Sequence, residues 1–389
     1  MKHIIYLTFY YEPDLCAGSF RNTPLIKELA QQADSETKIT VITTVPNRYG
    51  SFQVEAPKQE NFGNLTVYRI ALPAHQSNMK DQILAFKEYY KSVLKIVKGM
   101  KYDLVVASSS RLFTSYLGYK IAKKINVHLY LDIRDIFYDT MEDVLNNTFI
   151  KAIALPVIKK IEKKTFSYAS HINLISAGFK QYFQKYSNAN YTYYTNGIDD
   201  IFINNDSKNS TTKREKYQIV YAGNIGEGQG LHKIIPSFAK KLENKVDFLI
   251  IGDGGAKQKL LQEIDNLGVS NVTFKKPVKR DELIKIYENC DFSFVHLNDY
   301  DAFKKVLPSK IFELACFDQP MIAGVGGYAK SFLKENVENC LLFSPCNVEE
   351  LVDIFNNYVY QKYRREKFIH QFKRANINKE LAQSILSYL

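Results

Sequence analysis

The sequence has no tryptophan and only seven histidines and five cysteines among 389 residues. The histidines show no H-x-x-x-H or H-E-x-x-H spacing, so we expect no metal site. The cysteines form no C-x-x-C pair, and an odd number of them in apolar surroundings is typical of a reducing cytoplasm. No apolar run reaches the roughly 18 residues that a membrane-spanning helix needs. We therefore expect a cytoplasmic protein without a transmembrane segment.

The formal charge of +11 is the main excess in the composition. Three kinds of partner fit it: nucleic acid, an anionic membrane face, or a phosphorylated substrate. No nucleic-acid module accompanies the lysines, so we expect no nucleic acid as partner. The segment from Phe149 to Phe166 predicts a basic amphipathic helix that could lie on anionic lipid at the inner face of the cell membrane. A solvated helix face is the alternative.

Short Val, Ile, Tyr and Phe runs alternate with helix-length segments along most of the chain, which predicts βαβ units and parallel sheets. Two such series are separated by a polar linker at residues 199–216. We therefore predict an α/β protein of two Rossmann-like, doubly wound domains that face each other across a cleft. The expected parts are a first domain at 1–198, a second at 217–357, and helices at 358–389 that pack back on the first domain.

Glycine-rich turns follow several predicted strands. Gly18 opens a helix after the first strand, where backbone N–H groups suit a phosphate or a sugar hydroxyl. The stretch "YAGNIGEGQGL" opens the second half, and Gly252 begins another turn in "IIGDGG". The first of these stretches fits neither the Walker nor the dinucleotide pattern. Two such turns on one sheet favour a nucleotide, whereas a plain helix start is the alternative at Gly18.

The stretch "VLPSKIFELACFDQPMIAG" predicts a helix that Ser309 caps and that ends near Asp318. Glu313 would then accept both ribose hydroxyls of a sugar nucleotide, while Lys310 and free N–H groups hold the diphosphate. A surface ion pair between Lys310 and Glu313 is the alternative.

In the first half, "LYLDIRDIFYD" places Asp132, Arg134 and Asp135 after a strand, where we expect them to face the cleft. Arg134 would bind donor phosphate or orient the acceptor, and with Asp135 it is a candidate catalytic residue. A structural Asp–Arg pair is the alternative. The segment "TNGIDD", Thr195–Asp200, is the expected hinge.

Taken together, "YAGNIGEGQGL", "IIGDGG", "KKPVKRDELIKIYENCDFSFVHL" and "LPSKIFELACFDQPMIAG" resemble the family-4 retaining glycosyltransferases of the GT-B fold. "LDIRDIF" and "LPSKIFE" are similar to the bacterial surface-polysaccharide branch that includes N-acetyl-L-fucosamine transferases. The resemblance covers nearly the whole chain and is more specific in the second half.

The resemblance implies further site residues and two departures from the family pattern. Glu313 matches the second of two family glutamates, the ribose contact, but the first falls on Lys305. The family's diphosphate-binding arginine and lysine fall on Asn224 and Gln229. The loop that holds the base matches Val278 and Lys279. We hypothesise that Lys305 takes over stabilisation of the leaving group.

The resemblance implies a metal-independent retaining transferase without a cofactor, whose donor is a UDP-sugar. The sugar would be an N-acetylated hexosamine or a deoxyhexosamine. The acceptor would be a saccharide or a polyprenyl-diphosphate-linked saccharide in the synthesis of capsule, O-antigen or similar polysaccharide. Alternatives are a sugar-nucleotide epimerase of the same fold and a non-catalytic module that binds nucleotide sugars.

Overall fold

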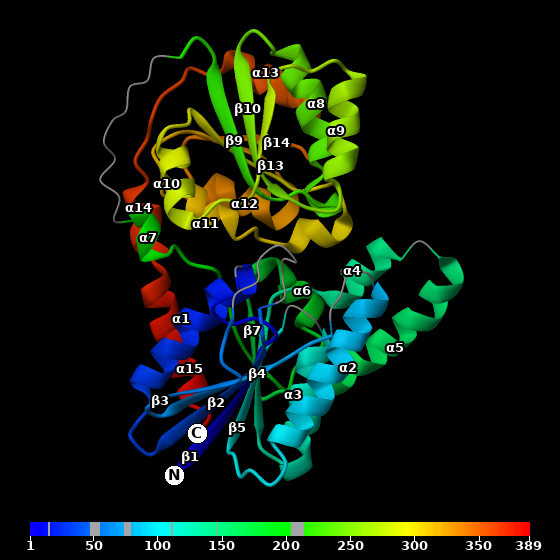
Figure 1. Ribbon diagram of the computed structural model, residues 1–389, viewed down its shortest axis with the longest axis vertical. Helices are drawn as coiled ribbons and strands as arrows, with labels where there is room; N and C mark the ends of the chain where they lie inside the picture. The colour runs from blue at the N-terminus through cyan, green and yellow to red at the C-terminus, as the bar shows by residue number, and fades with distance from the viewer. Residues whose placement is uncertain (15, 47–54, 74–78, 110–111, 146, 204–213) are drawn as a thin grey trace. The chain divides into compact units, whose positions relative to one another are not determined.

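The computed structural model describes residues 1–14, 16–46, 55–73, 79–109, 112–145, 147–203 and 214–389. The chain divides into two compact units (Figure 1). The first contains Met1–Asn196 together with Ala375–Leu389, and the second contains Gly197–Arg374.

The first unit is built on an eight-stranded sheet of order β3-β4-β2-β1-β5-β6-β7-β8. Every strand pairs in parallel with its neighbours except β3, which is antiparallel to β4. The order in which successive strands are added reverses between β1 and β5, which is the switch point where α/β sheets bind ligands. The strands are β1 (Lys2–Leu7), β2 (Thr37–Thr44), β3 (Gln59–Phe62), β4 (Leu65–Ile70), β5 (Leu104–Ser109), β6 (His128–Ile133), β7 (His171–Leu174) and β8 (Asn190–Thr192).

Helices cover both faces of this sheet, as a parallel sheet requires. On one face, α1 and α15 bury Leu25, Leu29, Leu381 and Ile385 against β1 and β2. On the other side, α2, α3 and α5 pack next to one another (Figure 1). The helices are α1 (Ala17–Gln32), α2 (Met79–Ile96), α3 (Leu112–Ile125), α4 (Phe137–Val144), α5 (Thr148–Phe166), η1 (Ala177–Phe179), α6 (Lys180–Phe183) and α15 (Arg374–Leu386).

The second unit has a six-stranded sheet of order β11-β10-β9-β12-β13-β14, with every pair parallel. Its switch point lies between β9 and β12. The parallel α/β architecture predicted for both halves is confirmed. The strands are β9 (Tyr217–Asn224), β10 (Val246–Asp253), β11 (Val272–Lys275), β12 (Phe292–His296), β13 (Met321–Gly324) and β14 (Cys340–Phe343).

The helices of the second unit follow its strands in alternation. They are α7 (Asp200–Ile203), η2 (Glu227–Gln229), α8 (Leu231–Lys241), α9 (Lys257–Asn266), α10 (Arg280–Glu288), η3 (Asp301–Lys305), α11 (Lys310–Leu314), α12 (Gly327–Asn336), α13 (Val348–Asn357) and α14 (Glu366–Gln371).

The unit boundaries differ from the predicted ones. The second unit extends to Arg374 instead of 357, because α14 packs within it. Phe368 and Phe372 lie 5.9 and 5.4 Å from the ring of Phe312, measured between centroids. Only residues 375–389 return to the first unit. In the predicted linker, residues 204–213 lie outside the described residues, whereas Phe202 is buried in the second unit.

The two ends of the second unit pair with each other. Ile198 donates its N–H to the carbonyl of Phe372 at 2.8 Å, and Arg374 donates to the carbonyl of Ile198 at 2.9 Å. A Cβ on Gly197 would lie 2.6 Å from Cα of Arg374, so only glycine allows this backbone contact. The chain therefore enters and leaves the second unit at one place.

The helix predicted from Ser309 to Asp318 is shorter than expected. It is α11, Lys310–Leu314, and the Ser309 side chain makes no capping hydrogen bond because Ser309 itself has helical φ and ψ. The carbonyls after the helix are used elsewhere: the buried guanidinium of Arg365 donates to the carbonyls of Phe317 and Gln319. The prediction of a Ser309 cap and of a helix to Asp318 was therefore wrong.

Candidate functional site

The switch point of the second sheet brings Lys310 onto Gly223, the next-to-last residue of β9. A Cβ on Gly223 would lie 2.4 Å from Cε and 3.3 Å from Nζ of Lys310. The lysine stem therefore crosses the end of β9 through space that only glycine leaves open. This contact places a cation at the carboxyl ends of the strands, where ligands of parallel sheets bind.

Gly252 lies beside Gly223 on β10. A Cβ on Gly252 would lie 1.8 Å from the carbonyl oxygen of Gly223. Gly252, which is predicted to contact the nucleotide, therefore also allows the ends of β9 and β10 to pack closely.

Asn224 and Gln229 bond to each other across the glycine-rich loop. Nδ2 of Asn224 donates to Oε1 of Gln229 at 2.9 Å, and the backbone N–H of Gly226 donates to the same oxygen at 3.2 Å. The two side-chain amides are neutral and bond to each other across the loop. They therefore do not replace the two cations that the family has at these positions. Their role toward a diphosphate stays a prediction.

His296, at the end of β12, forms a hydrogen bond with the backbone of this loop. Its Nδ1–H donates to the carbonyl of Gln229 at 2.6 Å, and its Nε2 accepts from the backbone N–H of Cys346 at 3.0 Å. These partners fix the neutral tautomer. Burial lowers the pKa of His296 to about 4. Sequence reasoning missed this residue, although it ends a strand next to the switch point.

Glu313 of α11 is mostly buried and lies beside Arg280, the first residue of α10. Oε1 of Glu313 is 3.9 Å from Nη2 of Arg280, and the same nitrogen lies 2.5 Å from Oδ2 of Asp199. Arg374 pairs with the other oxygen of Asp199. Glu313 therefore pairs with Arg280 in place of the alternative partner Lys310.

The predicted base-binding loop leads directly into Arg280. Val278 is half-buried, and Lys279 is exposed at the N-cap position of α10 without a capping side-chain bond. The fold thus brings Arg280, the residue after this loop, to Glu313. Lys305 ends η3 five residues before α11 and is half-buried.

In the first unit, Arg134 follows β6 and lies against Gly18 at the start of α1. A Cβ on Gly18 would lie 3.0 Å from Nη1 of Arg134. Among the described residues, Nε and Nη2 of Arg134 are buried without a hydrogen-bond partner. Buried donors without partners next to a helix N-terminus suit an anion.

Asp135 is the next residue, and its side chain is exposed at the surface. Partial removal of water from the carboxyl raises the pKa of Asp135, although the charge of Arg134 acts in the opposite direction.

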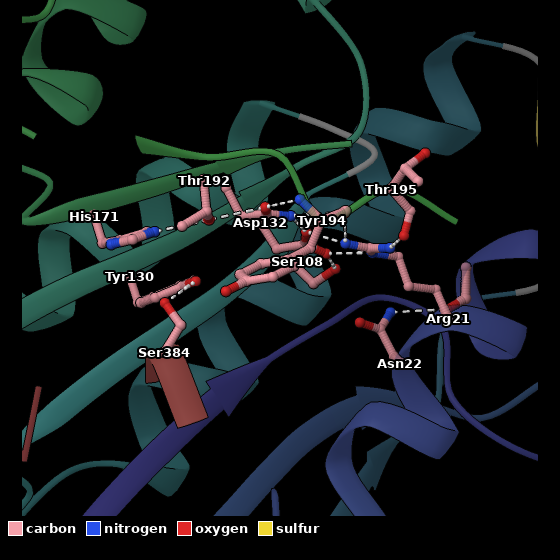
Figure 2. A network of polar contacts seen from close by, with 12 residues as sticks. Arg21, Asn22, Ser108, Tyr130, Asp132, His171, Thr192, Tyr194, Thr195 and Ser384 are labelled. Carbon is pink, nitrogen blue, oxygen red and sulfur yellow. Dashed lines mark hydrogen bonds and ion pairs between the residues drawn. The ribbon is translucent and has the colours of Figure 1, made fainter. Parts of the chain in front are cut away.

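Asp132 does not face a ligand site, and this expectation was wrong. It is buried and accepts from Nε and Nη2 of Arg21 at 2.9 and 2.8 Å, so the structural ion pair is with Arg21 (Figure 2). Burial alone would raise the pKa of Asp132, but the charge and hydrogen bonds of Arg21 hold it below the usual value. Ser108 and Asn173 donate to the same carboxylate.

The same arginine reaches the backbone that precedes the second unit. Nη1 and Nη2 of Arg21 donate to the carbonyls of Thr195 and Tyr194, each at 2.9 Å (Figure 2). Asn173 also bonds the backbone of Tyr194. The predicted hinge, Thr195–Asp200, thus starts at a carbonyl that Arg21 holds; its motion stays a prediction.

Among the described residues, no group of three His, Cys, Asp or Glu side chains could hold a metal ion. In that same part of the chain, no helix is both long and apolar enough to cross a bilayer.

Known proteins are similar to this chain at two levels. Residues 202–375 match the family Glycosyl transferases group 1. In sequence, 93 residues are 33% identical to WcaI of Escherichia coli strain K12, provisionally named as a colanic acid biosynthesis glycosyl transferase. That match covers only 24% of this chain and 23% of WcaI.

Solved structures resemble the whole chain. Anabaena Alr3699/HepE, crystallised with UDP and glucose, is 15% identical and covers 100% of both chains with a TM-score of 0.70. An α,α-trehalose-phosphate synthase (UDP-forming) of Burkholderia vietnamiensis is 11% identical, with the same coverage and a TM-score of 0.68. The lipopolysaccharide outer core galactosyltransferase WaaB is 12% identical, again with full coverage and a TM-score of 0.61.

At such identities these structures show the fold alone, which is the GT-B fold of two Rossmann-like units. The second unit, from residue 202 to 375, is similar to the domain of glycosyl transferases group 1, and this similarity supports a glycosyltransferase.

Proposed function

We propose that the protein is a retaining, metal-independent glycosyltransferase that uses a UDP-sugar as donor. The observation that carries the proposal is Lys310 lying across Gly223 at the switch point, in the unit that is similar to glycosyl transferases group 1. Crystals of Anabaena HepE contain UDP and glucose, which supports the choice of UDP. No cofactor is proposed, because the UDP-sugar donor itself carries the leaving group.

Each part of the donor has a proposed contact in the second unit. Val278 and Lys279 hold the base, and Glu313 accepts the ribose hydroxyls. Lys310 binds the diphosphate, with Gly252 and the loop between Asn224 and Gln229 beside it. Because α11 has only five residues, its dipole is small, and side-chain charge at Lys310 matters more than the Ser309 end of the helix.

The difficult step is breaking the anomeric bond while negative charge develops on the diphosphate. Lys310, and by our hypothesis Lys305, stabilise that charge. The acceptor oxygen bonds to the anomeric carbon on the face from which the diphosphate departs, and the departing phosphate oxygen accepts the acceptor's proton, so neither a protein nucleophile nor a protein base is needed. In the first unit, Arg134 beside Gly18 binds phosphate or orients the acceptor, and Asp135 is a candidate catalytic residue beside it.

The proposed biology is the synthesis of a bacterial surface polysaccharide such as capsule or O-antigen. The name of WcaI, a colanic acid glycosyl transferase, supports this assignment. The transferred sugar would be an N-acetylated hexosamine or a deoxyhexosamine, as in the N-acetyl-L-fucosamine branch. The acceptor would be a saccharide carried on polyprenyl diphosphate, so we place the enzyme in the cytoplasm, peripheral on the inner face of the membrane.

A melting-temperature screen tests the proposed donor. UDP or a UDP-sugar should raise the Tm of the full chain, because a ligand that binds only the folded state stabilises it, whereas GDP and dTDP should raise it less. Stabilisation by GDP or dTDP alone, or by no nucleotide, would overturn the donor assignment.

Turnover separates the transferase from its two alternatives. Release of UDP together with a glycosylated product in the presence of EDTA supports a metal-independent transferase. Interconversion of sugar nucleotides without UDP release indicates an epimerase, and tight binding without turnover indicates a binding module. Near-normal turnover by Lys305→Ala would refute the hypothesis for Lys305.

A further inference from the structure

The first half of α5 exposes a row of large apolar side chains. Phe149 is 76% exposed, Ile150 50%, Ile153 56% and Val157 53%. Phe149, Ile153 and Val157 recur every four residues, and Ile150 lies three residues before Ile153. Such spacings put the four side chains on one side of the helix, where they form a single apolar row. A face this apolar on a described helix marks an interaction surface.

The second half of α5 anchors the helix in the first unit. Ile158, Thr165 and Phe166 are buried, and so is Glu162, which accepts from the hydroxyl of Tyr182. Glu162 is the only acidic residue of α5. The exposed charged side chains of the helix are therefore all lysines: Lys159, Lys160, Lys163 and Lys164.

A shallow groove of about 440 Å³ lies between Tyr138 of α4 and one side of α5, and its lining includes none of the four residues of the apolar row. Leu155 and Pro156 form an apolar part of its lining, and Lys151 and Lys159 line it as well. Nζ of Lys159 lies 5.0 Å above the ring of Tyr138. Apolar lining with lysines beside it suits a lipid whose acyl chain is apolar and whose head group is anionic.

We infer that α5 docks on an anionic phospholipid surface, with the apolar row inserted among the acyl chains and the four lysines at the phosphates. Charge decides between occupants: a second copy of α5 would bring four more lysines against these four, whereas anionic lipid attracts each of them. The exposed acids Glu142 and Asp143 lie on α4, and the carbonyl of Glu142 accepts a hydrogen bond from Lys151 in the first half of α5, away from the four exposed lysines. This inference rests on the proposed function only for the reason to dock: membrane docking would hold the enzyme near a lipid-linked acceptor.

Vesicle sedimentation of the full chain tests the docking surface. The protein should bind vesicles that contain phosphatidylglycerol much more strongly than neutral phosphatidylcholine vesicles, and added salt should weaken the binding. The double variant Phe149→Ser/Ile153→Ser should lose at least about tenfold in binding, since two large apolar side chains no longer insert. Replacing the four lysines by glutamine should remove the preference for anionic lipid.

A matched control comes from α2, where Ile83 and Leu84 are 63% and 55% exposed. Ile83→Ser/Leu84→Ser should bind vesicles as the unaltered protein does. All variants should keep their Tm and their stabilisation by UDP, which separates docking from folding and from donor binding. The inference is overturned if the unaltered protein ignores anionic vesicles, or if both α5 variants still bind them. It is also overturned if the apolar variant only converts a dimer into a monomer.

Discussion

The carboxylate of Asp132 accepts two parallel hydrogen bonds from the guanidinium of Arg21, and both side chains are almost completely buried, at 1% and 2% exposure. The pair joins β6 to α1 and, through the carbonyls of Tyr194 and Thr195, to the end of the first unit. A buried ion pair of this kind stabilises the fold only when both charges and their hydrogen-bond partners are present.

Arg21→Met should therefore destabilise the first unit by about 3 to 5 kcal/mol, because it leaves the Asp132 carboxylate buried without its counter-charge. Urea unfolding measures the loss. Lys27→Met is the control, since Lys27 pairs with Glu12 at the surface and should change stability by less than about 1 kcal/mol. Adding Asp132→Leu to Arg21→Met should recover part of the loss, and no recovery would contradict this account of the pair.

Glu313 should discriminate between ribose and deoxyribose. We expect Glu313→Gln to bind UDP about tenfold more weakly, because a hydrogen bond to a charged acceptor contributes about 1.5 to 3 kcal/mol. Its affinity for 2′-deoxy-UDP should change much less. Calorimetry with both nucleotides measures the two affinities.

Arg280 should position Glu313 for that contact, since its guanidinium lies between Glu313 and Asp199. Arg280→Gln should reduce the preference for UDP over 2′-deoxy-UDP, and adding Glu313→Gln should cause little further loss. Arg364→Gln is the control, because Arg364 pairs with Asp318 and Glu366 at a similar exposure. An unchanged preference in Arg280→Gln would show that Glu313 acts without it.

Gly223→Ala should weaken diphosphate binding by displacing Lys310. The new Cβ would lie 2.4 Å from Cε of Lys310, so the lysine must leave the end of β9. We expect the affinity for UDP to fall toward that of Lys310→Ala, measured by the same calorimetry. Gly255→Ala is a matched control, since a Cβ there meets nothing within 4 Å. Full affinity in Gly223→Ala would mean that Lys310 does not bind the diphosphate from this position.

Two buried histidines should make the fold sensitive to acid. Burial lowers the pKa of His171 and of His296 to about 4, from about 6.5 when unfolded. Between these values the unfolded chain binds more protons, so stability is present above about pH 6.5 and is lost as the pH falls toward 4. The loss should be about 2 to 3 kcal/mol per histidine, measured by denaturant unfolding across this range.

The His296→Gln variant isolates one of these contributions. It should be less stable at neutral pH, because it disturbs the bonds to Gln229 and Cys346, but its stability should fall less steeply with acid. His370→Gln, at an exposed position, should keep the slope of the unaltered protein. Identical slopes in all three proteins would rule out His296 as an acid-sensitive group.

The sequence pattern predicted the strands whose residues are apolar enough to be buried in the two sheets, but it missed β3 and β8. The first is the polar segment Gln59–Phe62, largely exposed, and the second has only the three residues Asn190–Thr192. Both lie at the edges of their sheet, where backbone pairing rather than apolar burial defines a strand. The local pattern does not encode such pairing.

The sequence likewise predicted some residues of the candidate site and missed others. Lys310 and Glu313 could be found because their helix follows a recognisable motif. Arg280, Arg21 and His296 could not, because their roles depend on partners such as Asp199, 81 residues from Arg280, and Asp132, 111 residues from Arg21. The length of α11 was misjudged because the N–H groups of Cys316 and Phe317 bond to carbonyls three residues back, at Glu313 and Leu314, which tightens the turn and ends the α-helix.

The place of α15 bears on how this protein folds as it is made. Leu381, Ala382 and Ile385 belong to the same core as Leu25 and Ile39, yet the ribosome adds them only after the entire second unit. The nascent second unit has all its strands before the first can close its core. Until α15 is made, the apolar side chains of α1 that pack against it stay exposed on the nascent chain. Exposed apolar side chains of this kind are what chaperones bind.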